Sequence, residues 1–149
     1  IEFSDLTVTL QTKIIFEEGS SNIRFEREIL NMTNPDAEVT INEYIVACYG
    51  TTEYPEDMTG ITLSASSDSE SKSLTYEYKC RDEAVDNGEE ASAVIPAIET
   101  KVSLSTDSDN GTSYFEEGYA FSPMFKLGFK KSIKDKEVVK TWLKLEKAN

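Results

Sequence analysis

Apolar and polar residues alternate along most of this chain, and a period of two is the pattern of a strand with one buried face. Leu6, Val8 and Leu10 alternate with acidic and hydroxyl residues near the start, and Phe125 and Leu127 alternate with lysine and glycine near the end. Segments of this kind occupy residues 6–16, 23–25, 39–48, 61–65, 74–80, 93–95, 102–105, 114–121, 125–130 and 138–147. Short strands at this spacing predict an all-β protein with little helix.

The number and spacing of these segments also indicate how they pack. About nine to eleven short strands separated by turn residues are typical of two stacked sheets. We therefore predict an all-β, single-domain antiparallel β-sandwich, immunoglobulin-like or jelly-roll-like, that spans residues 1–149. A true immunoglobulin pattern is not met, because Trp142 follows both cysteines instead of lying between them.

One segment leaves room for a helix. In residues 138–147, Val139, Trp142, Leu143 and Glu146 also fit a helical stripe. The β-branched pair Val138 and Val139 favours a strand, which is our prediction.

Three turn signals divide the second half of the chain. Asn87-Gly88 suits the positive φ angles of a tight turn, and Pro96 suits a break between two strands. The turn residues 107–111 lie between the strand at 102–105 and the aromatic segment at 114–121, so we predict a hairpin there.

The sequence lacks the residues that several common catalytic and phosphate-binding motifs require. The chain has no histidine, so no Ser-His or Cys-His pair can form, and its 7 glycines make no phosphate-binding loop. We expect a non-enzymatic protein without a cofactor, although two of its 28 carboxylates could in principle serve a hydrolase.

Asp107 and Asp109 loosely resemble a calcium loop. A polar turn is the favoured interpretation, because Gly111 and Gly118 occupy the wrong positions, and weak calcium binding stays open.

The two cysteines, Cys48 and Cys80, lie in strand-like segments and outside any CxxC motif. We predict that both face the interior and form a disulfide, which would stabilise the fold by roughly 3–4 kcal/mol. Glycosylation sequons begin at Asn31 and Asn110. Together these features predict an extracellular protein or one displayed on a cell or virion surface.

Charge is divided unevenly along the chain. Residues 1–125 hold 25 acidic and 7 basic residues, whereas residues 126–149 hold 8 lysines and 3 acidic residues. Acidic residues concentrate after each cysteine, and such patches attract basic partners. We expect a basic protein partner and no nucleic acid, with these candidate contacts: Glu53, Tyr54, Glu56, Asp57, Asp82, Glu83, Asp86, Glu89 and Glu90.

Two alternative functions stay open. The chain could be a structural subunit of a surface fibre, virion or tail, in which lysine-rich strands dock on the acidic part of another copy. It could also be a small-molecule carrier with a barrel cavity lined by Phe115, Tyr119, Phe121, Phe125 and Phe129, although ordinary core packing of these rings is the favoured interpretation. The sequence has no run of about 20 apolar residues, so we expect no membrane insertion.

Overall fold

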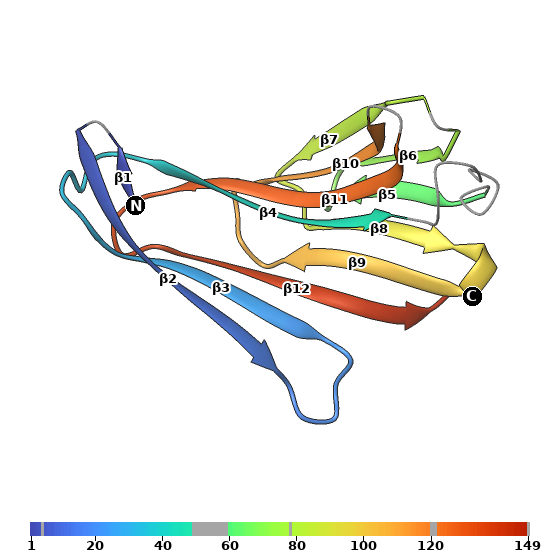
Figure 1. Cartoon of the computed structure of the whole chain (residues 1–149), viewed down its shortest axis with the longest axis horizontal. Coiled ribbons are helices and arrows are strands. Elements are labelled where there is room, and N and C mark those ends of the chain that lie inside the picture. Colours follow the sequence, from blue (N-terminus) through green and yellow to red (C-terminus); the bar gives the residue numbers. More distant parts are fainter. Residues whose placement is uncertain (4, 49–59, 78, 120–121, 149) are drawn as a thin grey trace.

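The computed structural model is an antiparallel β-sandwich, as the alternation predicts (Figure 1). It describes residues 1–3, 5–48, 60–77, 79–119 and 122–148. The described residues contain twelve strands and no α-helix. Nor do they contain a helix with the length and apolar content that crossing a bilayer requires.

The two sheets differ in size. The larger has eight strands in the order β1 (Glu2–Phe3), β2 (Leu6–Phe16), β3 (Ile23–Met32), β12 (Val138–Lys147), β9 (Thr100–Thr106), β8 (Glu90–Ile95), β5 (Thr62–Ser66) and β6 (Ser71–Thr75). The smaller has four, in the order β4 (Val39–Cys48), β11 (Ser122–Ile133), β10 (Thr112–Tyr119) and β7 (Asp82–Asp86). The segment at 138–147 is therefore a strand, as expected.

The main core lies where the small sheet covers one half of the large sheet. Strand β10 packs on β5 and β8, and β11 packs on β8 and β9. The inward-facing residues of these strands form one buried cluster, which includes Ile61, Leu63, Ala65, Tyr76, Val85, Ala91, Ala93, Ile95, Phe115, Phe125 and Leu127. Burying these large side chains against one another supplies most of the driving force for bringing the two sheets together.

A second cluster closes the sandwich at the end where β2 and β3 approach β4 and β11. It contains Val8, Ile29, Met32, Leu104, Phe129, Ile133 and Val139. A bulge helps to build it: Leu10 pairs with Ile29 while Thr9 pairs with Asn31, so Leu30 is the extra residue. Because of the bulge, Ile29 and Met32 both face the core.

Three of the aromatic residues considered for a carrier cavity belong to these two clusters. Phe115 and Phe125 lie in the main core, and Phe129 lies in the second cluster. The side chain of Tyr119 and all of Phe121 fall outside the described residues. The three described rings are packed by neighbouring side chains.

The expected hairpin at residues 107–111 is wrong. Strand β9 pairs with β8 and β12 in the large sheet, whereas β10 pairs with β7 and β11 in the small sheet. The turn residues therefore cross from one sheet to the other. Residues 87–89 do the same between β7 and β8, and the 3-10 turn Pro96–Ile98 separates β8 from β9, as the proline predicted.

The predicted disulfide is also wrong, since Cys80 is an exposed free cysteine. Strand β6 ends at Thr75, so Cys80 does not share its inward face, and its φ of 53° places it in the left-handed region. The chain reaches Cys80 just before β7, at one edge of the small sheet, whereas Cys48 ends β4 at the other edge. Three strand spacings of about 4.8 Å separate them by about 14 Å, beyond the reach of a disulfide.

A buried carboxylate holds the connection that crosses from β6 to β7. Glu117 is 0% exposed on the inward face of β10. It accepts hydrogen bonds from the backbone N–H groups of Glu77 and Lys79 at 2.7 and 2.9 Å. The Arg81 guanidinium donates two more through Nε and Nη2 at 2.9 and 2.6 Å. A carboxylate buried with four donors fixes the crossing segment against the small sheet.

We predict that Glu117→Ala lowers the free energy of unfolding by about 3 kcal/mol, because two backbone donors and the Arg81 guanidinium lose their buried acceptor. Urea denaturation measures the change. The matched control is Glu116→Ala, which removes only the partly exposed 3.0 Å ion pair with Lys126 and should cost less than about 1 kcal/mol. Equal losses in the two variants would contradict this role for Glu117.

The position of Cys80 predicts its reactivity. An exposed thiol without a disulfide partner should react with maleimide in the native protein when no reductant is present. Intact mass followed by peptide mapping should place one adduct on Cys80. Labelling of Cys80 that begins only after reduction would show that the thiol is paired.

Candidate functional site

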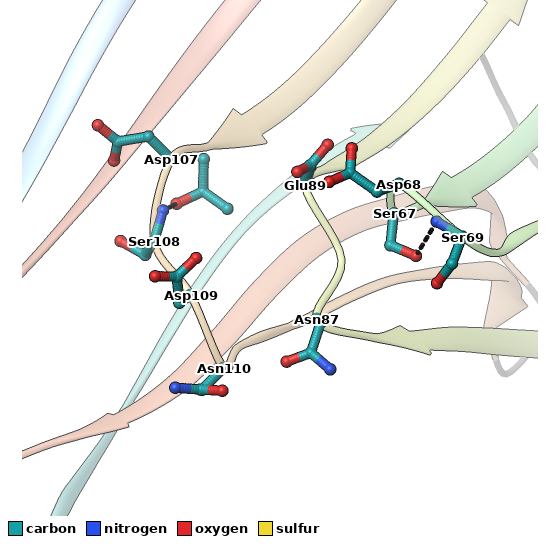
Figure 2. Close-up of a pocket in the computed structure, with 10 residues that line it drawn as sticks. Ser67, Asp68, Ser69, Asn87, Glu89, Asp107, Ser108, Asp109 and Asn110 are labelled. Atoms are coloured by element: carbon teal, nitrogen blue, oxygen red, sulfur yellow. Dashed lines mark hydrogen bonds between the residues drawn. The ribbon is translucent and has the colours of Figure 1, made fainter.

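Three polar loops converge on a recess at one end of the main core, shown in Figure 2. They are the β5–β6 turn and the two sheet-crossing connections, β7–β8 and β9–β10. We call this feature the acidic recess. Its lining consists of Ser67, Asp68, Ser69, Asn87, Glu89, Thr106, Asp107, Ser108, Asp109 and Asn110, around a space of about 350 Å³.

Hydroxyl side chains set the local shape of these loops. Ser67 Oγ accepts hydrogen bonds from the N–H groups of Ser69 and Glu70 at 3.3 and 3.1 Å, which closes the β5–β6 turn. Thr106 Oγ1 accepts one from the Ser108 N–H at 3.0 Å and donates to the Lys140 carbonyl at 2.8 Å. These bonds satisfy loop backbone groups, so the carboxylates remain available at the surface.

The backbone of Glu89 ties the three loops together. Its N–H donates to the Ser66 carbonyl at 2.7 Å, and its carbonyl accepts from the Thr106 N–H at 2.9 Å. Strands from different parts of the chain are therefore joined where the recess forms. The Glu89 side chain is exposed and points into this region beside Asp68 (Figure 2).

Two Asn-Gly pairs allow the crossing loops to turn. Asn87 and Asn110 have φ values of 53° and 58°, in the left-handed region that asparagine tolerates better than most residues. The glycines that follow are buried by close contacts. A Cβ on Gly88 would lie 2.5 Å from Ser113 Cβ, and one on Gly111 would lie 2.1 Å from the Phe129 ring. The turn chemistry and the core packing thus require these residue types together.

The electrostatics of the acidic recess are one-sided. Asp68, Glu89, Asp107 and Asp109 bring four carboxylates to it, and the described lining contains no Lys or Arg. Among the described residues, no group of three or more acidic side chains is arranged to hold a metal ion. Carboxylates spread around an open polar recess suit an ammonium or guanidinium group, which they can contact singly or in pairs.

The acidic residues that the sequence predicted as partner contacts do not all lie together in the structure. Glu53, Tyr54, Glu56 and Asp57 lie outside the described residues. Asp82 and Glu83 lie exposed at the start of β7, at the end of that strand remote from the recess. Asp86 ends the strand beside it and accepts a hydrogen bond from Thr112 at 3.2 Å.

The last two predicted contacts, Glu89 and Glu90, are neighbours with different roles. Glu89 lines the acidic recess, whereas Glu90 accepts from Lys101 at 2.6 Å on the outer face of the large sheet. Asp68 was missed because it lies in a serine-rich turn that looked like a simple polar connection. Its only signal was an acidic residue in a turn, which many surface loops share.

Both sequons are accessible. Asn31 is exposed on β3 beside the bulge, and Asn110 is exposed at the rim of the acidic recess.

Lys126 and Lys130 lie on the outward face of β11, opposite to that of Phe125, Leu127 and Phe129. Lys126 pairs with Glu116 at 3.0 Å, and its Nζ lies 4.9 Å from the centre of the Tyr44 ring. The hydrogen bond to Glu116 is the main cause that raises the pKa of Lys126. Lys130 Nζ lies 5.7 Å from the centre of the Tyr114 ring. These lysines are partly engaged within the small sheet, as polar faces of amphipathic strands commonly are.

A second candidate surface is apolar. Six side chains on the core-facing side of β2, β3 and β12 extend beyond the small sheet, and we call them the open face: Ile14, Phe16, Ile23, Phe25, Leu143 and Leu145. Phe16 is 75% exposed and Ile14 is 55% exposed. The Arg27–Glu43 ion pair, with a distance of 3.0 Å, bridges β3 and β4 where the open face begins.

No protein-family model matches this chain, and no curated protein shows significant sequence similarity to it. The geometry of the acidic recess and of the open face is therefore the only available basis for a function.

The Arg27–Glu43 pair predicts a pH dependence. Burial raises the pKa of the Glu43 carboxyl above its ordinary value, and the nearby Arg27 opposes but does not cancel this effect. A carboxyl whose pKa is raised in the folded state contributes stability that is present at low pH and lost as the pH rises through that pKa.

Glu43→Gln removes this titration. The free energy of unfolding of the unmodified protein should therefore rise relative to that of the variant as the pH falls from 7 towards 4.5. Urea denaturation of both proteins across this range measures the difference. A difference that is constant, or that moves in the opposite direction, would contradict the raised pKa.

Proposed function

We propose that this chain is a non-enzymatic domain, secreted or displayed on a surface, that binds a basic protein partner through the acidic recess. The observation that carries the proposal is the convergence of Asp68, Glu89, Asp107 and Asp109 from three loops, with no cation in the described lining. Loops held on a rigid sandwich are common places for binding residues. A cluster of one sign of charge also accelerates the approach of an oppositely charged partner.

The character of the acidic recess supports a charged partner over a small apolar ligand. Small-molecule sites are mostly apolar, with a few placed polar groups. Here the described lining consists of acidic, amide and hydroxyl side chains. Lysine or arginine side chains of a partner would gain charge-assisted hydrogen bonds at this surface.

The proposed contacts are the carboxylates that line the acidic recess. Of the acidic residues singled out in the sequence, Glu89 lines the acidic recess, together with Asp68, Asp107 and Asp109. Asp82 and Glu83 are remote from the recess and would affect a partner only through the long-range electrostatic field of the protein. The proposed extracytoplasmic location rests on the exposed sequons, because the free Cys80 removes the disulfide from that argument.

A structural subunit is the second candidate function, and the open face favours it. Exposed Ile14, Phe16 and Leu145 are unusual for a monomer that stays alone in water. Assembly through this surface is compatible with partner binding at the acidic recess, because the two surfaces are formed by different residues.

The proposed function predicts that a short lysine-rich peptide binds the chain at low ionic strength and dissociates as salt is added. The double variant Asp107→Asn/Asp109→Asn should weaken binding about tenfold, since each exposed ion pair contributes a modest free energy. Fluorescence anisotropy with a labelled peptide, measured at several salt concentrations, gives the dissociation constants.

The matched control is Glu2→Gln/Asp5→Asn, which removes the same two charges from exposed positions near β1. This control should retain nearly all of the binding. Equal weakening by both double variants would show that only net charge matters, and absence of binding at low salt would overturn the proposal.

A further inference from the structure

The open face continues the inward face of the large sheet beyond its cover. Strand pairing places Phe16 opposite Ile23, Ile23 opposite Leu143, and Leu143 opposite Leu104. Directly opposed residues lie on the same side of a sheet. Since Leu104 belongs to the buried second cluster, the whole row faces the side on which the small sheet packs.

Burial falls steadily along this row. Leu104 is 1% exposed, Leu143 and Ile23 are half-buried, and Phe16 is 75% exposed. The neighbouring row behaves in the same way, from buried Thr141 through Phe25 to Ile14. The apolar pattern of a core face therefore extends about two strands further than the protein's own small sheet.

The cover ends because β4 is the last strand of the small sheet on this side. In Figure 1, β2 and β3 diverge from β4 towards the turn that joins them, so the separation grows along the strands. Near the start of β2, the second cluster closes the gap. At the other end, nothing within the described ranges lies over Ile14 and Phe16.

The charge on this surface is low for such an acidic chain. None of the six open-face positions is ionisable, although the chain carries a formal charge of −13. Two charged side chains lie on the same face. Arg27 is paired with Glu43, and Lys147 lies at the end of β12, two residues beyond Leu145. Two copies can therefore meet through the six apolar positions, with Lys147 at the margin of the contact, and apolar rows are complementary to one another.

The area of the open face is of the order that a pair of copies needs. From the exposed fractions of its side chains, the open face exposes on the order of 450 Å² of apolar surface. Two such faces would bury about 900 Å², which is close to the roughly 1,000 Å² that a specific interface is expected to reach.

We propose that the open face is a homodimer interface, in which a second copy of this chain packs its own open face against Ile14, Phe16, Ile23, Phe25, Leu143 and Leu145 around a two-fold axis. Each copy then supplies the sheet cover that the other lacks. The contact is between sheet faces and leaves the acidic recess free, so it does not depend on the proposed function.

Sedimentation equilibrium of the whole chain tests this directly. The mass should approach twice the monomer mass of 16.7 kDa as concentration rises, and dimerisation should strengthen with added salt, because salt screens the repulsion between two acidic copies. Phe16→Glu should raise the dimer dissociation constant at least about tenfold. Ile14→Lys should do the same despite its opposite charge, because either change places an ion in an apolar contact.

The matched control is Lys13→Gln, which changes the charge by the same amount as Phe16→Glu but lies on the opposite face of β2. It should dimerise like the unmodified protein. Circular dichroism and urea denaturation check that each variant folds, as expected for substitutions at exposed positions.

A monomer at every concentration and salt would overturn the proposal, as would a dimer that Phe16→Glu and Ile14→Lys leave intact. Binding of the open face to a lipid vesicle or to an unrelated protein, by a chain that does not self-associate, would also overturn it. Salt separates this test from that of the acidic recess, since salt should strengthen dimerisation and weaken peptide binding.

Discussion

The unequal size of the two sheets is the constraint on which the rest of this structure depends. A sheet with an apolar face must bury that face, and four strands can cover only part of eight. Strands β5, β6, β8 and β9 lie under the small sheet and form the main core. At one end the bulge at Leu30 turns Ile29 and Met32 inward, which closes a second cluster. At the other end β2, β3 and β12 run past their cover and leave the open face.

Frequent crossing between the sheets places the other candidate site. Strands that follow one another along the chain, such as β7 and β8 or β9 and β10, lie in opposite sheets, so their connections must pass over the end of the sandwich. Tight crossings need residues that tolerate left-handed backbone and that satisfy loop N–H groups, as Asn87, Asn110 and Thr106 do. Several such loops at one end bring acidic side chains together. At the β6–β7 crossing, buried Glu117 accepts hydrogen bonds from the loop backbone and from the partly exposed Arg81 side chain.

The acidic recess and the open face differ in the interaction through which each would bind. The binding proposed at the acidic recess would act through charge, which is long in range, speeds association and is sensitive to salt. The dimer contact proposed at the open face would act through removal of apolar area from water, which is short in range and is not weakened by salt. A chain of net charge −13 repels its own copies at a distance, so an apolar self-contact requires a surface that is itself free of charge. The open face meets this requirement at each of its six positions.

The sequence by itself determined the class of the protein, because strand alternation is local information. The period of two in residues 6–16, 125–130 and 138–147 is visible without any partner strand, and it correctly assigned inward and outward faces. Only the tertiary structure decided which strands pair, since pairing depends on competition among distant segments. The sequence therefore could not reveal that residues 107–111 cross between sheets, that Cys80 is exposed far from Cys48, or that Asp68 joins Asp107 and Asp109. It also could not distinguish Phe16 from a core residue, because exposure depends on where the opposing sheet ends.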